Sequence, residues 1–280
     1  MNVRRVAAGS VTLEVAEAGA GGRPLLLLHG FTGAKEDLPA DLLDDLAEKG
    51  WHAVAPDLRG HGGSDKPPGE DAYSLQIYVD DSLALADALG WSEFTALGIS
   101  LGGMILQRLV IDHEPRVRAL VLVDSSHGRP ESLDPESVAL GAEIVREHGL
   151  LTLLALQNER RDRDPTTTAA HLRLLRERPD WAEFGDRKLL ASSPDMWVAM
   201  TREMVQQEDR LDALSHVSVP TLVIVGEQDD AYRLHCERIA KAIPGARLAV
   251  ISDAGHAPQF ENTAGFCDAL TTFLEEVARG

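Results

Sequence analysis

Cysteine is scarce in this sequence, and long hydrophobic runs are missing from it. The two cysteines, Cys236 and Cys267, have no spacing typical of a metal site, so we expect two buried, reduced thiols and no disulfide. Apolar runs such as residues 25–28 are far shorter than the ~20 residues that cross a bilayer. No apolar segment of the signal-peptide type follows residues 1–6. We therefore expect a soluble, cytoplasmic protein.

Positive charge is also in short supply. The chain carries 27 lysines and arginines against 45 aspartates and glutamates, which gives a formal net charge of -18. A chain this acidic repels phosphate groups. This argues against a nucleic acid partner and against binding to an anionic membrane surface.

Motifs for metals and nucleotide cofactors are missing as well. The ten histidines are scattered, with no HExxH pattern, and the cysteines form no ligand pair. No Gly-x-Gly-x-x-Gly sequence opens a helix after a strand. We expect no metal and no cofactor.

What the sequence does contain is a regular alternation of short apolar strands and amphipathic helices. Strand patterns lie at residues 24–28, 52–56, 93–97 and 119–123, with helical patterns between them at 36–49, 75–89 and 104–110. Such alternation predicts an α/β fold with a mostly parallel sheet covered by helices on both faces.

The strand pattern stops near Ser126 and resumes at residues 219–225. The intervening stretch is charged, favours helix and is interrupted by several prolines. We predict a core domain made of residues 1–126 and 217–280, with residues 127–216 forming an inserted helical cap.

Ser100 lies in the most informative motif, a Gly-x-Ser-x-Gly sequence between a predicted strand and a predicted helix. Small residues at Gly98 and Gly102 allow a sharp turn that exposes the Ser100 hydroxyl at the end of the sheet. The helix that follows directs backbone N–H groups toward developing negative charge. Ser100 is therefore a candidate nucleophile, although a serine that only caps a helix would give the same local pattern.

A nucleophilic serine needs a base, and the base needs a third group to orient it. His256 and Asp229 each follow a predicted strand, where the side chains of a parallel sheet gather. The chain order of serine, aspartate and histidine suits this type of site. We predict His256 as the base and Asp229 as the acid, with Asp230 and Asp124 as alternatives for the acid.

Four motifs in their expected order give the chain a resemblance to the α/β-hydrolase superfamily that covers nearly all of it. They are His29-Gly30-Phe31-Thr32-Gly33, Asp57-Leu58-Arg59-Gly60-His61-Gly62-Gly63-Ser64, the turn at Ser100, and Asp253-Ala254-Gly255-His256. The chain resembles the small bacterial esterase and lactonase branch, including proteins similar to 3-oxoadipate enol-lactonase. The resemblance implies a mostly parallel eight-stranded sheet with an inserted helical cap.

The same resemblance implies an oxyanion hole built from backbone N–H groups. One donor is expected at Leu101, directly after the nucleophile, and the other at Phe31, on the loop after the third strand. Asp57, Arg59 and His61 resemble a loop that braces this oxyanion segment.

The cap is expected to set substrate choice. Met196 and Met200 recur at helical spacing beside Trp197, with Trp181 upstream, and these four side chains are candidates to line an apolar acyl pocket. The same spacing also suits a helix that packs these residues into the core.

These observations predict a serine hydrolase that cleaves a carboxylic ester or lactone through an acyl-enzyme intermediate. Hydrolysis of a carbon–carbon bond in a ring-cleavage product, cofactor-free perhydrolysis, and a small-molecule receptor that keeps the triad are the alternatives. The expected partner is a small-molecule ester or lactone, and both a monomer and a homodimer remain open.

Overall fold

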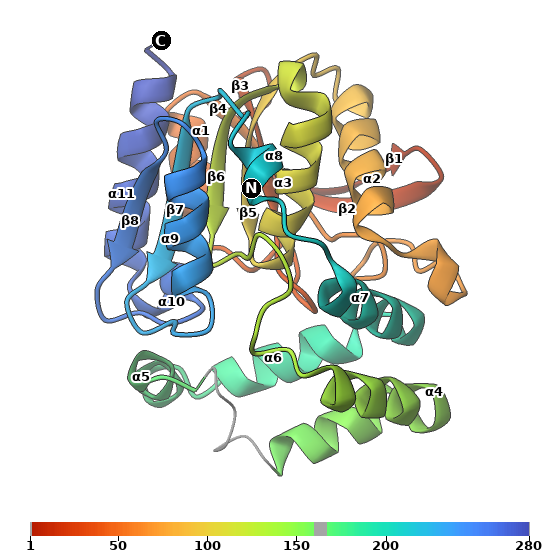
Figure 1. The fold of residues 1–280 in the computed structure, drawn as a ribbon. Coiled ribbons are helices and arrows are strands. Elements are labelled where there is room, and N and C mark those ends of the chain that lie inside the picture. Colours follow the sequence, from red (N-terminus) through yellow and green to blue (C-terminus); the bar gives the residue numbers. More distant parts are fainter. Residues whose placement is uncertain (1, 160–166, 280) are drawn as a thin grey trace.

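The computed structural model describes residues 2–159 and 167–279, whose centre is one eight-stranded sheet (Figure 1). The strands are β1 Asn2–Ala8, β2 Val11–Ala18, β3 Arg23–Leu28, β4 Trp51–Pro56, β5 Phe94–Ile99, β6 Val117–Val123, β7 Thr221–Gly226 and β8 Arg247–Ile251. Their order across the sheet is β1-β2-β4-β3-β5-β6-β7-β8. Strand β2 is antiparallel to β1 and β4, and every other neighbouring pair is parallel. The predicted mostly parallel sheet is confirmed.

Helices cover both faces of the sheet, and a further group lies beyond the ends of the strands. They are α1 Leu42–Glu48, α2 Leu75–Ala88, α3 Leu101–His113, α4 Pro135–Asn158, α5 Ala169–Glu177, α6 Trp181–Leu190, α7 Pro194–Gln206, α8 Leu211–Leu214, α9 Arg233–Ala242, α10 Pro258–Glu261 and α11 Thr263–Val277. Two short 3₁₀ turns span Glu70–Ala72 and Glu114–Arg116. Figure 1 shows α4, α5 and α6 below the ends at which β6, β7 and β8 terminate.

The period-two alternation of strand side chains explains how both faces become buried. In β3, Leu26 and Leu28 belong to the core shared with α2, α3 and α9, whereas Leu25 and Leu27 belong to the core shared with α1 and α11. Successive strand residues point to opposite faces, so a strand covered on both sides needs an unbroken apolar run. This run therefore fixes β3 in the middle of the sheet.

The helices between β6 and β7 begin at residues that cap them. Asp134, Thr168 and Ser193 precede α4, α5 and α7, and the side chain of each accepts a hydrogen bond from a backbone N–H in the first turn. Such caps satisfy N–H groups that have no partner inside the helix. Within the described part of residues 127–216 the chain forms α4 to α8 and no strand. The boundaries of the proposed cap stay a prediction.

Both cysteines are free thiols, with Cys236 buried and Cys267 half-buried. None of the helices in the described ranges is long and apolar enough to cross a membrane.

Candidate active site

Ser100 stands at the turn between β5 and α3 in a left-handed conformation, with φ at 50°. A Cβ at Gly98 would collide with the backbone of Gly102, and a Cβ at Gly102 would collide with the carbonyl of Leu28. Only glycine permits this close approach of strand, turn and helix. The Ser100 N–H donates to the Val123 carbonyl at 2.8 Å, which ties the turn to β6.

The structure brings Ser100, His256 and Asp229 together from three separate loops. His256 Nε2 lies 3.2 Å from Ser100 Oγ, and His256 Nδ1 lies 2.7 Å from Asp229 Oδ2. Asp229 is buried, whereas its neighbour Asp230 is exposed. A carboxylate on Nδ1 holds the proton there and leaves Nε2 able to accept one. The geometry therefore links Asp229, rather than Asp230, to His256.

The loop after β3 lies against Ser100, because a Cβ at Gly30 would be only 3.5 Å from the Ser100 Cβ. His29 Nδ1 is 2.7 Å from the Gly30 carbonyl, while its Nε2 accepts a hydrogen bond from the Leu58 N–H at 2.9 Å. Burial lowers the pKa of His29 to about 4, so the ring is neutral and carries its proton on Nδ1. Because a trans peptide directs its C=O and N–H to opposite sides, anchoring the Gly30 carbonyl here turns the Phe31 N–H the other way.

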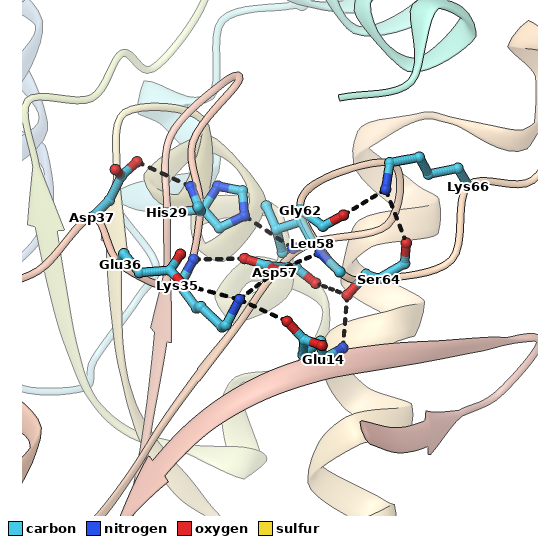
Figure 2. Close-up of polar contacts among 12 residues, drawn as sticks. Glu14, His29, Lys35, Glu36, Asp37, Asp57, Leu58, Gly62, Ser64 and Lys66 are labelled. Atoms are coloured by element: carbon cyan, nitrogen blue, oxygen red, sulfur yellow. Dashed lines mark hydrogen bonds and ion pairs between the residues drawn. The ribbon is translucent and has the colours of Figure 1, made fainter. Parts of the chain in front are cut away.

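Asp57 braces this loop, as the sequence predicts, with help from Lys35 (Figure 2). Its carboxylate accepts from the Lys35 backbone N–H at 2.7 Å, from Lys35 Nζ at 3.0 Å and from the Gly63 N–H at 2.8 Å. Burial alone opposes ionisation, but the hydrogen bonds from Lys35 and Gly63 hold the pKa of Asp57 below its usual value. Figure 2 shows Lys35 reaching Glu14 as well.

The other two residues of the predicted brace differ in their contacts. The His61 ring packs edge-on against His29 with centroids 4.8 Å apart, and burial lowers its pKa to about 3. The Arg59 guanidinium instead forms two hydrogen bonds with buried Asp81 on α2, at 2.6 and 2.7 Å. Arg59 therefore fixes its loop to α2, and the side-chain hydrogen bonds that it forms with described residues go to Asp81 and Ser10 rather than to the loop after β3.

A cavity of about 280 Å³ opens onto Ser100 and His256. Its walls are mainly apolar and aromatic, with the ion pair of half-buried Lys188 and buried Asp37 as its charged part. The remaining lining residues are Gly30, Phe31, Ile99, Leu133, Trp181, Met204, Tyr232, Ala257, Gln259 and Phe260. A larger hollow of about 810 Å³ lies where several strands begin, but its lining includes no histidine or cysteine.

The predicted substrate-binding residues divide between this cavity and the core. Trp181 lines the cavity and packs on Phe260, with ring centroids 4.6 Å apart. Met196 and Met200 do not line it, because they are fully buried on the face of α7 that packs into the main core. Trp197 lies behind the wall, with its ring 6.0 Å from Phe31. The assignment of Met196, Trp197 and Met200 to the cavity wall is therefore corrected.

Three further residues contact the candidate site or its supporting loops, and the sequence did not point to them. The buried Tyr232 ring lies over His256, with centroids 4.5 Å apart, and burial raises the pKa of its phenol. Glu261 Oε2 accepts from the Gly255 N–H at 2.6 Å and the Ala257 N–H at 3.3 Å. The charge of Lys35 is neutralised by its ion pairs with Glu14 and Asp57. No recognised motif marks any of these positions.

One group of side chains in the described residues could hold a metal ion by distance alone. Asp124, Asp229 and His256 each offer a ligand atom, and these atoms lie within 4.8 Å of one another. Two of these ligand groups are already engaged in hydrogen bonds, because His256 Nδ1 bonds Asp229 and Asp124 Oδ1 accepts from the Gly226 N–H. We therefore interpret the group as a hydrogen-bonded relay.

This chain is similar in sequence and in fold to several known proteins. A sequence model for the alpha/beta hydrolase fold matches residues 23–263. A 2-hydroxymuconate semialdehyde hydrolase from Pseudomonas sp. (strain CF600) is 29% identical over 280 residues, covering 98% of this chain and 94% of the relative. The structure of a thermophilic esterase from Thermogutta terrifontis is 27% identical, with a TM-score of 0.81 over 99% of both chains. The enol-lactonase from Burkholderia xenovorans LB400 shares the fold, with a TM-score of 0.82 at 23% identity over 97% of this chain and 100% of its own.

Proposed function

Because the chain belongs to the alpha/beta hydrolase family, within its esterase and lactonase branch, we propose that it hydrolyses a carboxylic ester or lactone through a serine acyl-enzyme. The observation that carries this proposal is the relay from Ser100 through His256 to Asp229 at the cavity floor. Distances of 3.2 and 2.7 Å suit proton transfer from the hydroxyl and orientation of the base.

In the first half of the reaction, His256 Nε2 takes the Ser100 proton as Oγ attacks the substrate carbonyl. The backbone N–H of Leu101, at the start of α3, and that of Phe31 stabilise the negative charge on the carbonyl oxygen by donating hydrogen bonds to it. N–H groups in the first turn of a helix have no acceptor within the helix, which leaves Leu101 able to donate. Protonated His256 then gives its proton to the departing alkoxide, and the acyl group stays on Ser100.

In the second half, His256 removes a proton from a water molecule that attacks the acyl-enzyme. Collapse of the second tetrahedral intermediate releases the acid and returns the proton to Ser100. Asp229 stabilises the imidazolium in both halves. With a lactone the departing alkoxide remains attached to the acyl group, so one product is released at the end.

Hydrolysis of p-nitrophenyl acetate, butyrate and octanoate tests this proposal. Ser100→Ala should lose at least about a thousandfold in kcat for every ester, because the nucleophile is removed while binding is kept. Ser92→Ala, which changes an exposed serine before β5, is the matched control and should keep full activity. Equal turnover by the wild type and the Ser100 variant would overturn the assignment.

A second candidate is the hydrolysis of a carbon–carbon bond, favoured by the 29% identity to a 2-hydroxymuconate semialdehyde hydrolase. Turnover of 2-hydroxymuconate semialdehyde at a higher kcat/KM than any of the three esters would support it. No turnover of this compound by a protein that hydrolyses the esters would exclude it.

A further inference from the structure

Asp124 is a second buried carboxyl group beside the proposed triad acid. It directly follows β6 in a left-handed conformation, with φ at 42°, and its side chain is fully buried. The Asp124 N–H donates to the Ile224 carbonyl at 3.0 Å, and Oδ1 accepts from the Gly226 N–H at 2.9 Å. Both contacts go to β7, the strand that leads into Asp229. This backbone conformation is uncommon outside glycine, although aspartate adopts it more readily than most residues, and here the two hydrogen bonds to β7 hold it.

The second oxygen of Asp124 receives no hydrogen bond from any described residue. A carboxyl oxygen of Asp124 lies within 4.8 Å of one of Asp229 and of a His256 nitrogen. Two ionised carboxylates in a buried site repel each other, and an unsatisfied buried charge is unfavourable. A single proton on Asp124 removes the repulsion and lets its carboxyl group donate in the side-chain hydrogen bond that joins it to Asp229.

The surroundings of Asp124 favour the protonated form. Burial raises its pKa well above the usual value, and the negative charges of Asp229 and Glu261 act in the same direction. The Gly226 N–H opposes them but does not prevail. Two groups that act on Asp124 from α9 and the residue before it, the Cys236 thiol and the Tyr232 phenol, also have raised pKa values and are neutral.

We propose that Asp124 is a positioning residue, which as a neutral carboxylic acid donates a hydrogen bond to Asp229 and so fixes Asp229 against His256. This inference rests on the proposed function of the triad. Its chemical consequence is that one negative charge, not two, lies beside the base. The proton affinity of His256 is then set by Asp229, with Asp124 fixing the direction in which the carboxylate points.

Two substitutions distinguish a neutral, donating Asp124 from an ionised Asp124 and from one that positions nothing. Asp124→Asn keeps the shape and an N–H donor without a charge, whereas Asp124→Ala removes the donor. We expect Asp124→Asn to retain kcat within about threefold and to leave the acidic limb of the kcat/KM–pH profile in place. Asp124→Ala should lose about 10- to 100-fold in kcat, because a misplacement of the base by about 1 Å can cost about a hundredfold in rate. Exposed Asp230→Asn is the matched control and should resemble the wild type.

Two results would overturn the proposal. A downward shift of the acidic limb in Asp124→Asn would mean that the wild type holds a negative charge at this position. Wild-type kcat and pH profile in a folded Asp124→Ala would mean that Asp124 positions nothing.

Infrared spectroscopy tests the protonation of Asp124 without an activity assay and without the alanine variant. The wild type at neutral pH should show the carbonyl band of a protonated carboxylic acid, and Asp124→Asn should lack it. A band missing from both proteins contradicts the neutral acid. If no substrate is turned over but the band is present, the proposed function fails while the assignment of the proton stands.

Discussion

Removing the Glu261 carboxylate should loosen the loop that carries His256, the proposed base. Glu261 Oε2 accepts from the N–H groups of Gly255 and Ala257, the residues on either side of His256, at 2.6 and 3.3 Å. The shorter bond is charge-assisted and contributes about 1.5–3 kcal/mol, and the longer one about 0.5 kcal/mol. Glu261→Ala should therefore lower the free energy of unfolding by about 2–4 kcal/mol.

The same change should act on catalysis through the position of His256. A misplacement of about 1 Å can cost about a hundredfold in rate, so Glu261→Ala should lose up to that in kcat with little change in KM. Glu261→Gln keeps an acceptor oxygen and should lose less kcat and less free energy of unfolding than Glu261→Ala. The assays are p-nitrophenyl butyrate hydrolysis and urea unfolding, with exposed Asp268→Ala on α11 as control. Wild-type kcat and stability in Glu261→Ala would refute the reasoning.

Three further changes test the fold and the cavity. His29 and His61 have folded pKa values of about 4 and about 3, below the ordinary value of about 6.5. The unfolded chain therefore binds more protons as pH falls from 6.5, and urea unfolding should show stability dropping by up to about 1.4 kcal/mol per pH unit for each histidine. An unchanged slope in His61→Gln would contradict this. Trp181→Ala should raise the octanoate-to-acetate ratio of kcat/KM about tenfold by opening the wall, and an unchanged ratio would remove Trp181 from the acyl site. Gly98→Ala should lower the free energy of unfolding by about 1–3 kcal/mol because its Cβ would meet backbone, whereas Gly185→Ala, in open space on α6, should not; equal melting temperatures would contradict the account of the turn.

The features that sequence could predict depend on local chemistry or chain order. The turn at Ser100 needs glycines at two fixed positions, and buried parallel strands need unbroken apolar runs, so both leave a readable pattern. His256 and Asp229 follow strands whose carboxyl ends meet at one edge of the sheet. These are consequences of the fold that require no knowledge of distant packing.

Other features depend on packing that the sequence does not record. Met196 and Met200 have helical spacing, but only the docking of α7 decides that they face the core and not the cavity. Lys35 and Glu261 are single charged residues whose partners lie on other loops or across a turn. The proximity of Asp124 to Asp229 requires the pairing of β6 with β7, so sequence could place Asp124 only as an alternative acid.

Covalent labelling of Ser100 tests the central claim most directly. The protein would be treated with a p-nitrophenyl alkylphosphonate, which forms a stable phosphonyl ester with an activated serine, and then digested for peptide mass spectrometry. We predict one label per chain on the peptide that contains Ser100, with p-nitrophenyl ester hydrolysis lost in proportion to labelling. Full activity in a protein labelled at Ser100, or loss of activity with the label on another residue, would contradict the serine mechanism.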